Sequence, residues 1–190
     1  TTVEDGNLLI NQATLLASVS DVDGLDLSVT NITLTNPSQG SIFYEGNGNW
    51  TFTPAANFNG VAAITFSVSD GVTTINQGMN INVTAVNDAP TASTVNMSMS
   101  EDGSLTFTNA QLLASSGAGD IEGSALSIAD VTSPIGTLSF NSGNNTWTLN
   151  NLPANFNGAI PLSFTVSDGV ATTAQTLNVT VNAVNDAPVV

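Results

Sequence analysis

The chain contains no lysine, arginine, histidine or cysteine among its 190 residues. Without basic side chains it has nothing to neutralise phosphate, which excludes nucleic-acid binding, lysine-dependent phosphate loops and Schiff-base chemistry. Without histidine or cysteine it has no Ser–His or Cys–His nucleophile pair, no zinc site with nitrogen or sulfur ligands and no thiol chemistry. It also has no apolar run near the ~18 residues that suggest a membrane span, and an acidic chain is not attracted to anionic membranes.

The charged residues are fifteen acids, which give a net charge of −15 and make up 8% of the chain. Hydrophobic residues are 41%, enough for a packed core, so the charge does not indicate a disordered chain. The remaining metal donors are carboxylate, amide, hydroxyl and backbone carbonyl oxygens. Hard oxygen ligands of this kind suit Ca²⁺ best.

The sequence contains two copies of one repeat. Short motifs recur in the same order and at a nearly constant spacing. Asp-Val-Asp-Gly at residues 21–24 returns as Asp-Ile-Glu-Gly at 120–123, and Val-Asn-Asp-Ala-Pro at 86–90 returns unchanged at 184–188. The repetition predicts two domains, residues 1–89 and 90–190. Because the chain starts and ends inside a motif, we expect it to be part of a longer protein.

Each repeat has the pattern of an all-β domain. Apolar residues alternate with polar ones at 64–68 and 79–83, and again at 162–166 and 177–181. Such alternation predicts strands with one face in a core, and Gly, Asn, Asp and Pro mark frequent turns. About seven strands in some 95 residues predicts a β-sandwich for each repeat. Trp50 and Trp147 are expected in the two cores, and the Leu-Leu pairs at 15–16 and 112–113 on short helical turns.

The acids lie almost entirely within the repeated motifs; only Asp26, Glu45 and Asp130 do not. On an extended segment, Asp21 and Asp23 point the same way and can converge on one cation. The aspartate of Ser-Asp-Gly and the Asn-Asp pair add further donors, so six or more oxygens become available, as Ca²⁺ requires. An isolated Asp-Gly is more often a simple turn, but the whole set, twice, without a balancing cation, favours calcium binding.

The order of these motifs resembles that of the cadherin-like tandem repeats of giant bacterial surface adhesins of the RTX type. A glutamate near the start, Asp-x-Asp, Ser-Asp-Gly after a hydrophobic strand and a closing Asn-Asp-Ala-Pro occur in both repeats. The resemblance implies two tandem seven-stranded Greek-key β-sandwiches of the Ig-like type, arranged end to end, with Ca²⁺ in the linkers. It also implies type I secretion, a location at the bacterial cell surface, and neighbouring repeats of the same chain as partners.

The resemblance implies a set of metal ligands at the junction between repeats. These are Glu4, Asn87, Asp88, Asp120, Glu122 and Asp168. Equivalent ligands would face a preceding repeat (Asp21, Asp23 and Asp70) and a following one (Glu101, Asn185 and Asp186). Asp5 and Asp102 are secondary candidates, each of which is alternatively a turn residue.

Two departures from the cadherin pattern reduce the expected number of ions. Ala85 and Ala183 stand where cadherins place an acid, and the uncharged Asn-Phe-Asn-Gly at 57–60 stands near their acidic mid-repeat element. We therefore expect one or two Ca²⁺ ions per junction.

The leading interpretation of function is a non-catalytic extender (spacer) of a surface adhesin used in cell adhesion and biofilm, monomeric in isolation. The alternative is an adhesive module that binds protein or carbohydrate directly through these domains. An enzyme is disfavoured, because the acidic pairs are local in sequence, whereas glycosidase carboxylates face each other across a cleft.

Overall fold

The structure, a computed structural model, describes residues 1–24 and 26–187. The chain divides into two compact units, Thr1–Val86 and Asn87–Val190. This division falls slightly before the boundary predicted at residue 89, because Asn87 and Asp88 form hydrogen bonds within the second unit.

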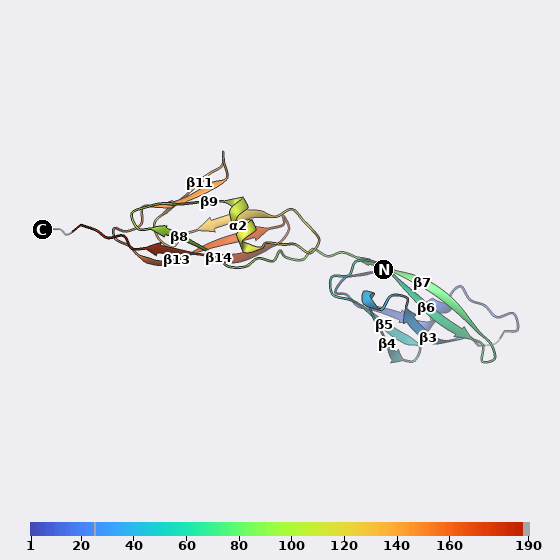
Figure 1. The fold of residues 1–190 in the computed structure, drawn as a ribbon. Coiled ribbons are helices and arrows are strands. Elements are labelled where there is room, and N and C mark those ends of the chain that lie inside the picture. Colours follow the sequence, from blue (N-terminus) through green and yellow to red (C-terminus); the bar gives the residue numbers. More distant parts are fainter. Residues whose placement is uncertain (25, 188–190) are drawn as a thin grey trace. The chain divides into compact units, whose positions relative to one another are not determined.

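Unit 1 is a β-sandwich of two sheets (Figure 1). Its described residues form a four-stranded sheet of order β1-β7-β6-β3 and a three-stranded sheet of order β2-β5-β4. The elements are β1 (Thr2–Val3), β2 (Leu8–Asn11), α1 (Gln12–Leu16), β3 (Ser28–Leu34), η1 (Pro37–Gln39), β4 (Gly40–Gly46), β5 (Asn49–Pro54), β6 (Gly60–Ser69) and β7 (Thr74–Thr84).

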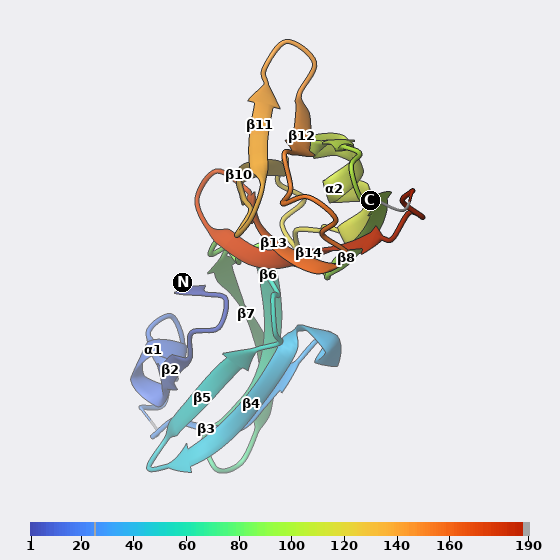
Figure 2. The same cartoon turned by 90° about the vertical axis from the view of Figure 1, so that its left-hand side faces the viewer.

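Unit 2 repeats this architecture. Its described residues form a four-stranded sheet of order β8-β14-β13-β10 and a three-stranded sheet of order β9-β12-β11. The elements are β8 (Val95–Ser100), β9 (Leu105–Thr108), α2 (Asn109–Ser116), β10 (Ser127–Thr132), β11 (Thr137–Asn141), β12 (Thr146–Asn150), β13 (Gly158–Ser167) and β14 (Thr172–Asn182). In Figure 2, β4 and β5 lie side by side in unit 1, as β11 and β12 do in unit 2. The predicted fold class, two tandem β-sandwiches, is confirmed.

The central strands follow the alternation in the sequence. In β6, Ala62, Ile64, Phe66 and Val68 are buried, while the residues between them point away from the core. Strand β13 repeats the pattern with Ile160, Leu162, Phe164 and Val166. Successive side chains of a strand point to opposite faces, so these apolar positions form the inner face of each sheet.

Each unit has its own hydrophobic core. The largest fully buried side chains among the described residues are Phe52 in unit 1 and Phe107 and Phe164 in unit 2. Trp50 is buried as predicted, whereas Trp147 is partly buried and packs against the core of unit 2. The Trp147 indole Nε1 donates a hydrogen bond to Asn109 Oδ1 at 2.7 Å, which explains how its polar edge is accommodated.

The two predicted helical turns are present as α1 and α2, and both begin with a side-chain cap. Asn11 Oδ1 accepts a hydrogen bond from the Thr14 backbone N–H at 2.8 Å, and Thr108 and Gln111 form a capping box. The buried leucines Leu15 and Leu112 attach the helices to the cores. No helix in the described part of the chain is both long enough and apolar enough to cross a membrane.

The first strand of the two units differs in length. In unit 2, β8 pairs in parallel with β14 over six residues, from Val95 opposite Leu177 to Ser100 opposite Asn182. In unit 1, β1 pairs with β7 over two residues only, Thr2 opposite Val83 and Val3 opposite Thr84. Within the described residues, the outer edge of β7 from Thr74 to Asn82 therefore has no strand beside it.

Candidate functional site

The residues that connect the two units are held against one end of unit 2. Asn87 Nδ2 donates a hydrogen bond to Asp168 Oδ2 at 2.8 Å, and the Asp88 backbone N–H donates to Glu122 Oε2 at 3.2 Å. These pairs are far apart in sequence, so it is the fold that brings the Asn-Asp motif to the two acidic loops. Four of the six residues predicted for the junction thus lie together.

Asp120 belongs to the same end of unit 2 and, like Asp88, carries an unsatisfied oxygen. Asp120 Oδ1 accepts a hydrogen bond from the Ser124 backbone N–H at 2.8 Å. Asp120 Oδ2 and Asp88 Oδ2 are buried and form no hydrogen bond within the described residues. A buried carboxylate oxygen without a partner is costly, and the chain has no basic side chain that could supply one.

The carboxylate of Asp168 is fixed by the turn that it starts. Its Oδ1 accepts hydrogen bonds from the backbone N–H groups of Val170 and Ala171, both at 2.6 Å. Three hydrogen bonds lower the pKa of Asp168 below its usual value. The bond from the Ala171 N–H has the largest effect, and those from the Asn87 amide and the Val170 N–H come next. Asp168 is therefore ionised at neutral pH, with Oδ2 directed to the Asn87 amide.

The corresponding end of unit 1 has the same turn but a different partner. Asp70 Oδ1 accepts from the N–H groups of Val72 and Thr73, at 2.7 and 2.6 Å, and its Oδ2 accepts from the Thr73 hydroxyl at 2.7 Å. The Thr73 side-chain hydrogen bond, with the two backbone bonds, lowers the pKa of Asp70 to about 2. Asp70 and Asp21 line one cavity of about 170 Å³, and Asp21 Oδ1 accepts from the backbone N–H of the exposed Asp23 at 2.8 Å.

Each repeat has one glutamate near its start, Glu4 or Glu101, which is buried and accepts a backbone hydrogen bond from the end of its own unit. Glu4, 1% exposed, accepts the Val86 N–H on Oε1 at 2.6 Å. Glu101, 6% exposed, accepts the Val184 N–H in the same way at 2.6 Å. Glu4 Oε2 also accepts from Asn59 Nδ2 at 3.5 Å, whereas Glu101 Oε2 is buried with no hydrogen bond in the described residues.

Asn59 is the residue whose role the sequence did not reveal. Its motif appeared only as an uncharged replacement for an acidic element, but its amide contacts the buried Glu4. The signal available was its fixed place in both repeats, since Asn157 is its counterpart. In unit 2, however, Asn157 Nδ2 donates to the Asn155 carbonyl at 3.3 Å instead of to Glu101.

The remaining predicted ligands lie at turns and at the end of unit 2. Asp5 and Asp102 are exposed and have positive φ values of 59° and 60°, as turn residues do, which agrees with the alternative given for them. Asn185 and Asp186 are exposed, and Asn185 Nδ2 donates to the Asp186 carbonyl at 3.2 Å.

No group of three or more acidic side chains in residues 1–24 and 26–187 is already arranged to hold a metal ion. The structure therefore shows which predicted ligands are neighbours without showing an assembled site. The donor set at the end of unit 2 nevertheless has the composition that a hard cation requires: carboxylates, an amide and two unsatisfied buried oxygens.

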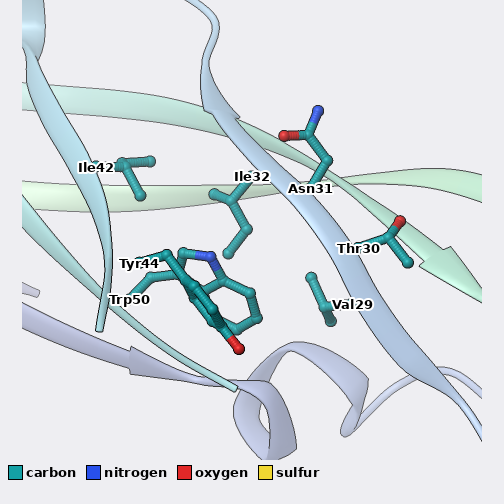
Figure 3. Close-up of a pocket in the computed structure, with 7 residues that line it drawn as sticks. All are labelled: Val29, Thr30, Asn31, Ile32, Ile42, Tyr44 and Trp50. Carbon is teal, nitrogen blue, oxygen red and sulfur yellow. The ribbon is translucent and has the colours of Figure 1, made fainter. Parts of the chain in front are cut away.

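A second concave region lies between the edge strands β3 and β4 of unit 1 (Figure 3). It has a volume of about 390 Å³, and in the close-up Tyr44 lies over Trp50 beside Ile32 and Val29. The two aromatic rings have centroids 5.1 Å apart. Phe140 and Trp147 form an equivalent pair at 4.6 Å in unit 2, so the ring pair recurs as a packing feature of the repeat.

The fold is thus that of two tandem β-sandwiches, and in unit 2 the acidic loops contact Asn87 and Asp88. The sequence profile of the cadherin-like domain matches this chain twice, at residues 1–84 and 86–182. The chain belongs to the cadherin-like domain family. Domains of this family are of an extracellular type and generally bind Ca²⁺, and membership indicates an adhesion or extender module.

Comparison with solved structures gives distant similarities. The human protocadherin-24 EC1-2 fragment is 18% identical, with a TM-score of 0.49, over 86% of this chain and 85% of that one. An endo-fucoidan hydrolase of glycoside hydrolase family 107, MfFcnA4, is 24% identical with a TM-score of 0.38, over 97% of this chain and 27% of that one. The chain thus spans about a quarter to a third of the fucoidan hydrolases that it matches. No curated protein matches the sequence.

Proposed function

We propose that this chain is a pair of non-catalytic extender repeats of a large bacterial surface adhesin of the RTX type, exported by a type I system, in which Ca²⁺ stiffens the connection between repeats. The observation that carries the proposal is the pair of buried, unsatisfied oxygens on Asp88 and Asp120. They lie at the end of unit 2 that also holds the segment connecting the units.

The residues that would hold the ion are those gathered at this end. Asp88, Asp120, Glu122 and Asp168 supply carboxylates, and Asn87 supplies an amide oxygen. When bound, Ca²⁺ would supply the positive charge that the chain lacks. Clustered carboxylates repel one another, since like charges 4 Å apart cost about 1 kcal/mol in water and about 4 kcal/mol at an effective dielectric of 20.

Adjacent residues of the connection are anchored in different units. The Val86 N–H is held by Glu4 in unit 1, and the Asn87 side chain is held by Asp168 in unit 2. The two anchored residues are consecutive in the sequence. An ion that fixed Asp88 to Asp120 and Glu122 would remove most of the remaining backbone freedom, which is what a stiff extender needs.

The proposal is tested by thermal unfolding in Ca²⁺ and in EGTA. Ca²⁺ at one hundred times its Kd adds about 2.7 kcal/mol, which raises the Tm of a unit of this size by about 10–20 °C. Asp120→Asn keeps an acceptor for the Ser124 N–H but removes the charge, so most of this rise should be lost. Asp130→Asn removes the same charge from the exposed edge strand β10 and should leave the rise intact.

Two results would contradict the proposal. The first is an unchanged Tm between millimolar Ca²⁺ and EGTA. The second is an equal stabilisation by Mg²⁺, which requires a tighter octahedral site and keeps its waters. Equal effects of the two ions would indicate general charge screening. The stiffening itself is measured as a narrower distribution of distances between spin labels placed in the two units when Ca²⁺ is present.

A further inference from the structure

The tryptophans of the two units differ in how the indole N–H is satisfied. In unit 2, Trp147 Nε1 donates a hydrogen bond to Asn109 Oδ1 at 2.7 Å. In unit 1, Gln12 stands at the position of Asn109, directly after the helix cap. Its Oε1 accepts instead from the Val29 backbone N–H, at 3.2 Å. Trp50 Nε1 is thus left without a hydrogen-bond partner among the described residues, although Trp50 is only 7% exposed.

This free donor opens to the cleft between β3 and β4, which Trp50 lines and which has a volume of about 390 Å³. The indole nitrogen is not one of the buried unsatisfied atoms of the structure, so it is reached from the cleft and not sealed in the core. Figure 3 shows the nitrogen at the end of the ring that faces Ile32. A ligand atom that accepts a hydrogen bond would satisfy this donor.

Tyr44 adds an aromatic face and a second donor to the same cleft. Its side chain is 54% exposed, and its ring lies over Trp50 with the centroids 5.1 Å apart. The Tyr44 hydroxyl accepts a hydrogen bond from the Gly48 backbone N–H at 3.3 Å, and its own proton remains available for another acceptor. In unit 2 the corresponding residue is Phe140, which has no hydroxyl.

The wall formed by β3 is apolar inside and polar at its rim. A β-bulge interrupts the pairing after Val29, so that Val29 and Ile32 both line the cleft. Thr30 and Asn31 are exposed, and the Asn31 amide forms no hydrogen bond with any described residue. The equivalent position after the bulge of unit 2 is Asp130. The cleft of unit 1 therefore has a neutral amide where unit 2 has an acid, and the residues that line it carry no charge.

We propose that the cleft between β3 and β4 of unit 1 is a binding site for a neutral carbohydrate. Its volume falls within the range of about 300–1,000 Å³ typical of small-molecule sites. The C–H face of a sugar ring would pack on the half-exposed Tyr44 ring. Sugar oxygens would accept hydrogen bonds from Trp50 Nε1 and the Tyr44 hydroxyl, and sugar hydroxyls would bond to the Asn31 amide. A neutral ligand is favoured because a chain with a net charge of −15 repels anions.

The cleft is separate from the acidic loops that would hold Ca²⁺. It is lined by residues between Val29 and Trp50, and none of them is an acid. Strands β3 and β4 are edge strands, at the ends of their sheets opposite to β1 and β2. Binding of a sugar should therefore be equal in Ca²⁺ and in EGTA, and a failed calcium experiment leaves the carbohydrate test decisive.

The test begins with the whole chain on an array of neutral and anionic glycans, followed by an NMR titration with the neutral glycan that binds best. The chain has two tryptophans and hence two indole N–H signals. The Trp50 signal should shift and saturate. The Trp147 signal should stay unchanged, because its N–H is already bonded to Asn109, so it serves as a control within the same molecule.

Three variants test the contacts one at a time. Tyr44→Phe keeps the ring and removes the hydroxyl, so it should weaken binding about two- to tenfold, the effect of one net hydrogen bond. Trp50→Phe removes the indole donor and should weaken binding by a similar factor. Phe43→Ala is the matched control: Phe43 is 67% exposed on the same strand but points to its other face, so binding should not change.

Thermal unfolding of each variant shows whether unit 1 is folded at the temperature of the titration, and Tyr44→Phe keeps the test decisive if Trp50→Phe is unstable. Four results would overturn the proposal. These are the absence of any bound glycan on the array, a preference for anionic glycans, equal shifts of the two indole signals, and an equal loss of binding in Tyr44→Phe and Phe43→Ala.

Discussion

Replacing one fully buried phenylalanine should destabilise one unit and leave the other unchanged. Phe52, on β5, is completely buried in the core of unit 1, and Phe107, on β9, is completely buried in the core of unit 2. The two core clusters share no residue. A Phe→Ala change in a core costs about 3–5 kcal/mol, against a total of about 5–15 kcal/mol for a domain.

This loss is large enough to separate the two unfolding transitions. For a unit of this size, 1 kcal/mol shifts the Tm by about 4–8 °C, so Phe52→Ala should lower the Tm of unit 1 by about 12–40 °C. The chain has two tryptophans, one in each unit. In a Trp147→Phe background the emission of Trp50 reports unit 1, and in a Trp50→Phe background Trp147 reports unit 2.

The measurement is thermal unfolding in EGTA, followed by tryptophan fluorescence in each background. Phe52→Ala should shift the Trp50 transition and not the Trp147 transition, and Phe107→Ala should do the reverse. Each variant is compared with its own single-tryptophan parent, so any cost of the Trp→Phe change cancels. A comparable drop in both transitions would refute the reasoning, because it would mean that the units unfold as one cooperative body.

Two further predictions concern turns. The hydrogen bonds from the Thr73 hydroxyl and from the backbone lower the pKa of Asp70 to about 2. What these bonds add to the free energy of unfolding is therefore present above pH 4 and is lost as the pH falls towards 2. Asp70→Asn should flatten this part of the curve of unfolding free energy against pH, measured by urea unfolding. Gly136 and Gly123 have similar positive φ values, 73° and 76°. Their surroundings differ, because a Cβ on Gly136 would lie 2.7 Å from Leu152 Cδ2, while a Cβ on Gly123 would meet no atom within 4 Å. Gly136→Ala should therefore lower the unfolding free energy clearly more than the ~1 kcal/mol of Gly123→Ala, and equal losses would contradict the steric argument.

The sequence predicted the central strands well because burial dominates there. The alternating residues of β6 and β13 have no alternative that buries as much apolar surface, so the period-two pattern determines which face is inside. The short helices were also predictable, since paired leucines follow an Asn or Thr cap.

The partners of the acidic residues were only partly predictable. Asp168 and Asn87 were assigned to one junction, and the structure joins them by a hydrogen bond. The contact of Asn59 with Glu4 was not foreseen, because an uncharged motif gives no sign that its amide lies beside a buried carboxylate. Two identical motifs also acquired different partners, since Asn157 donates to Asn155 and leaves Glu101 Oε2 unsatisfied.

The Ser-Asp-Gly motif shows why a turn and a ligand look alike in this sequence. The turn itself uses one carboxylate oxygen: Oδ1 of Asp70 and of Asp168 each accepts two backbone N–H groups. The other oxygen is left for whatever lies nearby, which is the Thr73 hydroxyl in unit 1 and the Asn87 amide in unit 2. The motif therefore folds the loop with either partner on its second oxygen, and the two units differ three positions after the aspartate, where Thr73 stands in unit 1 and Ala171 in unit 2.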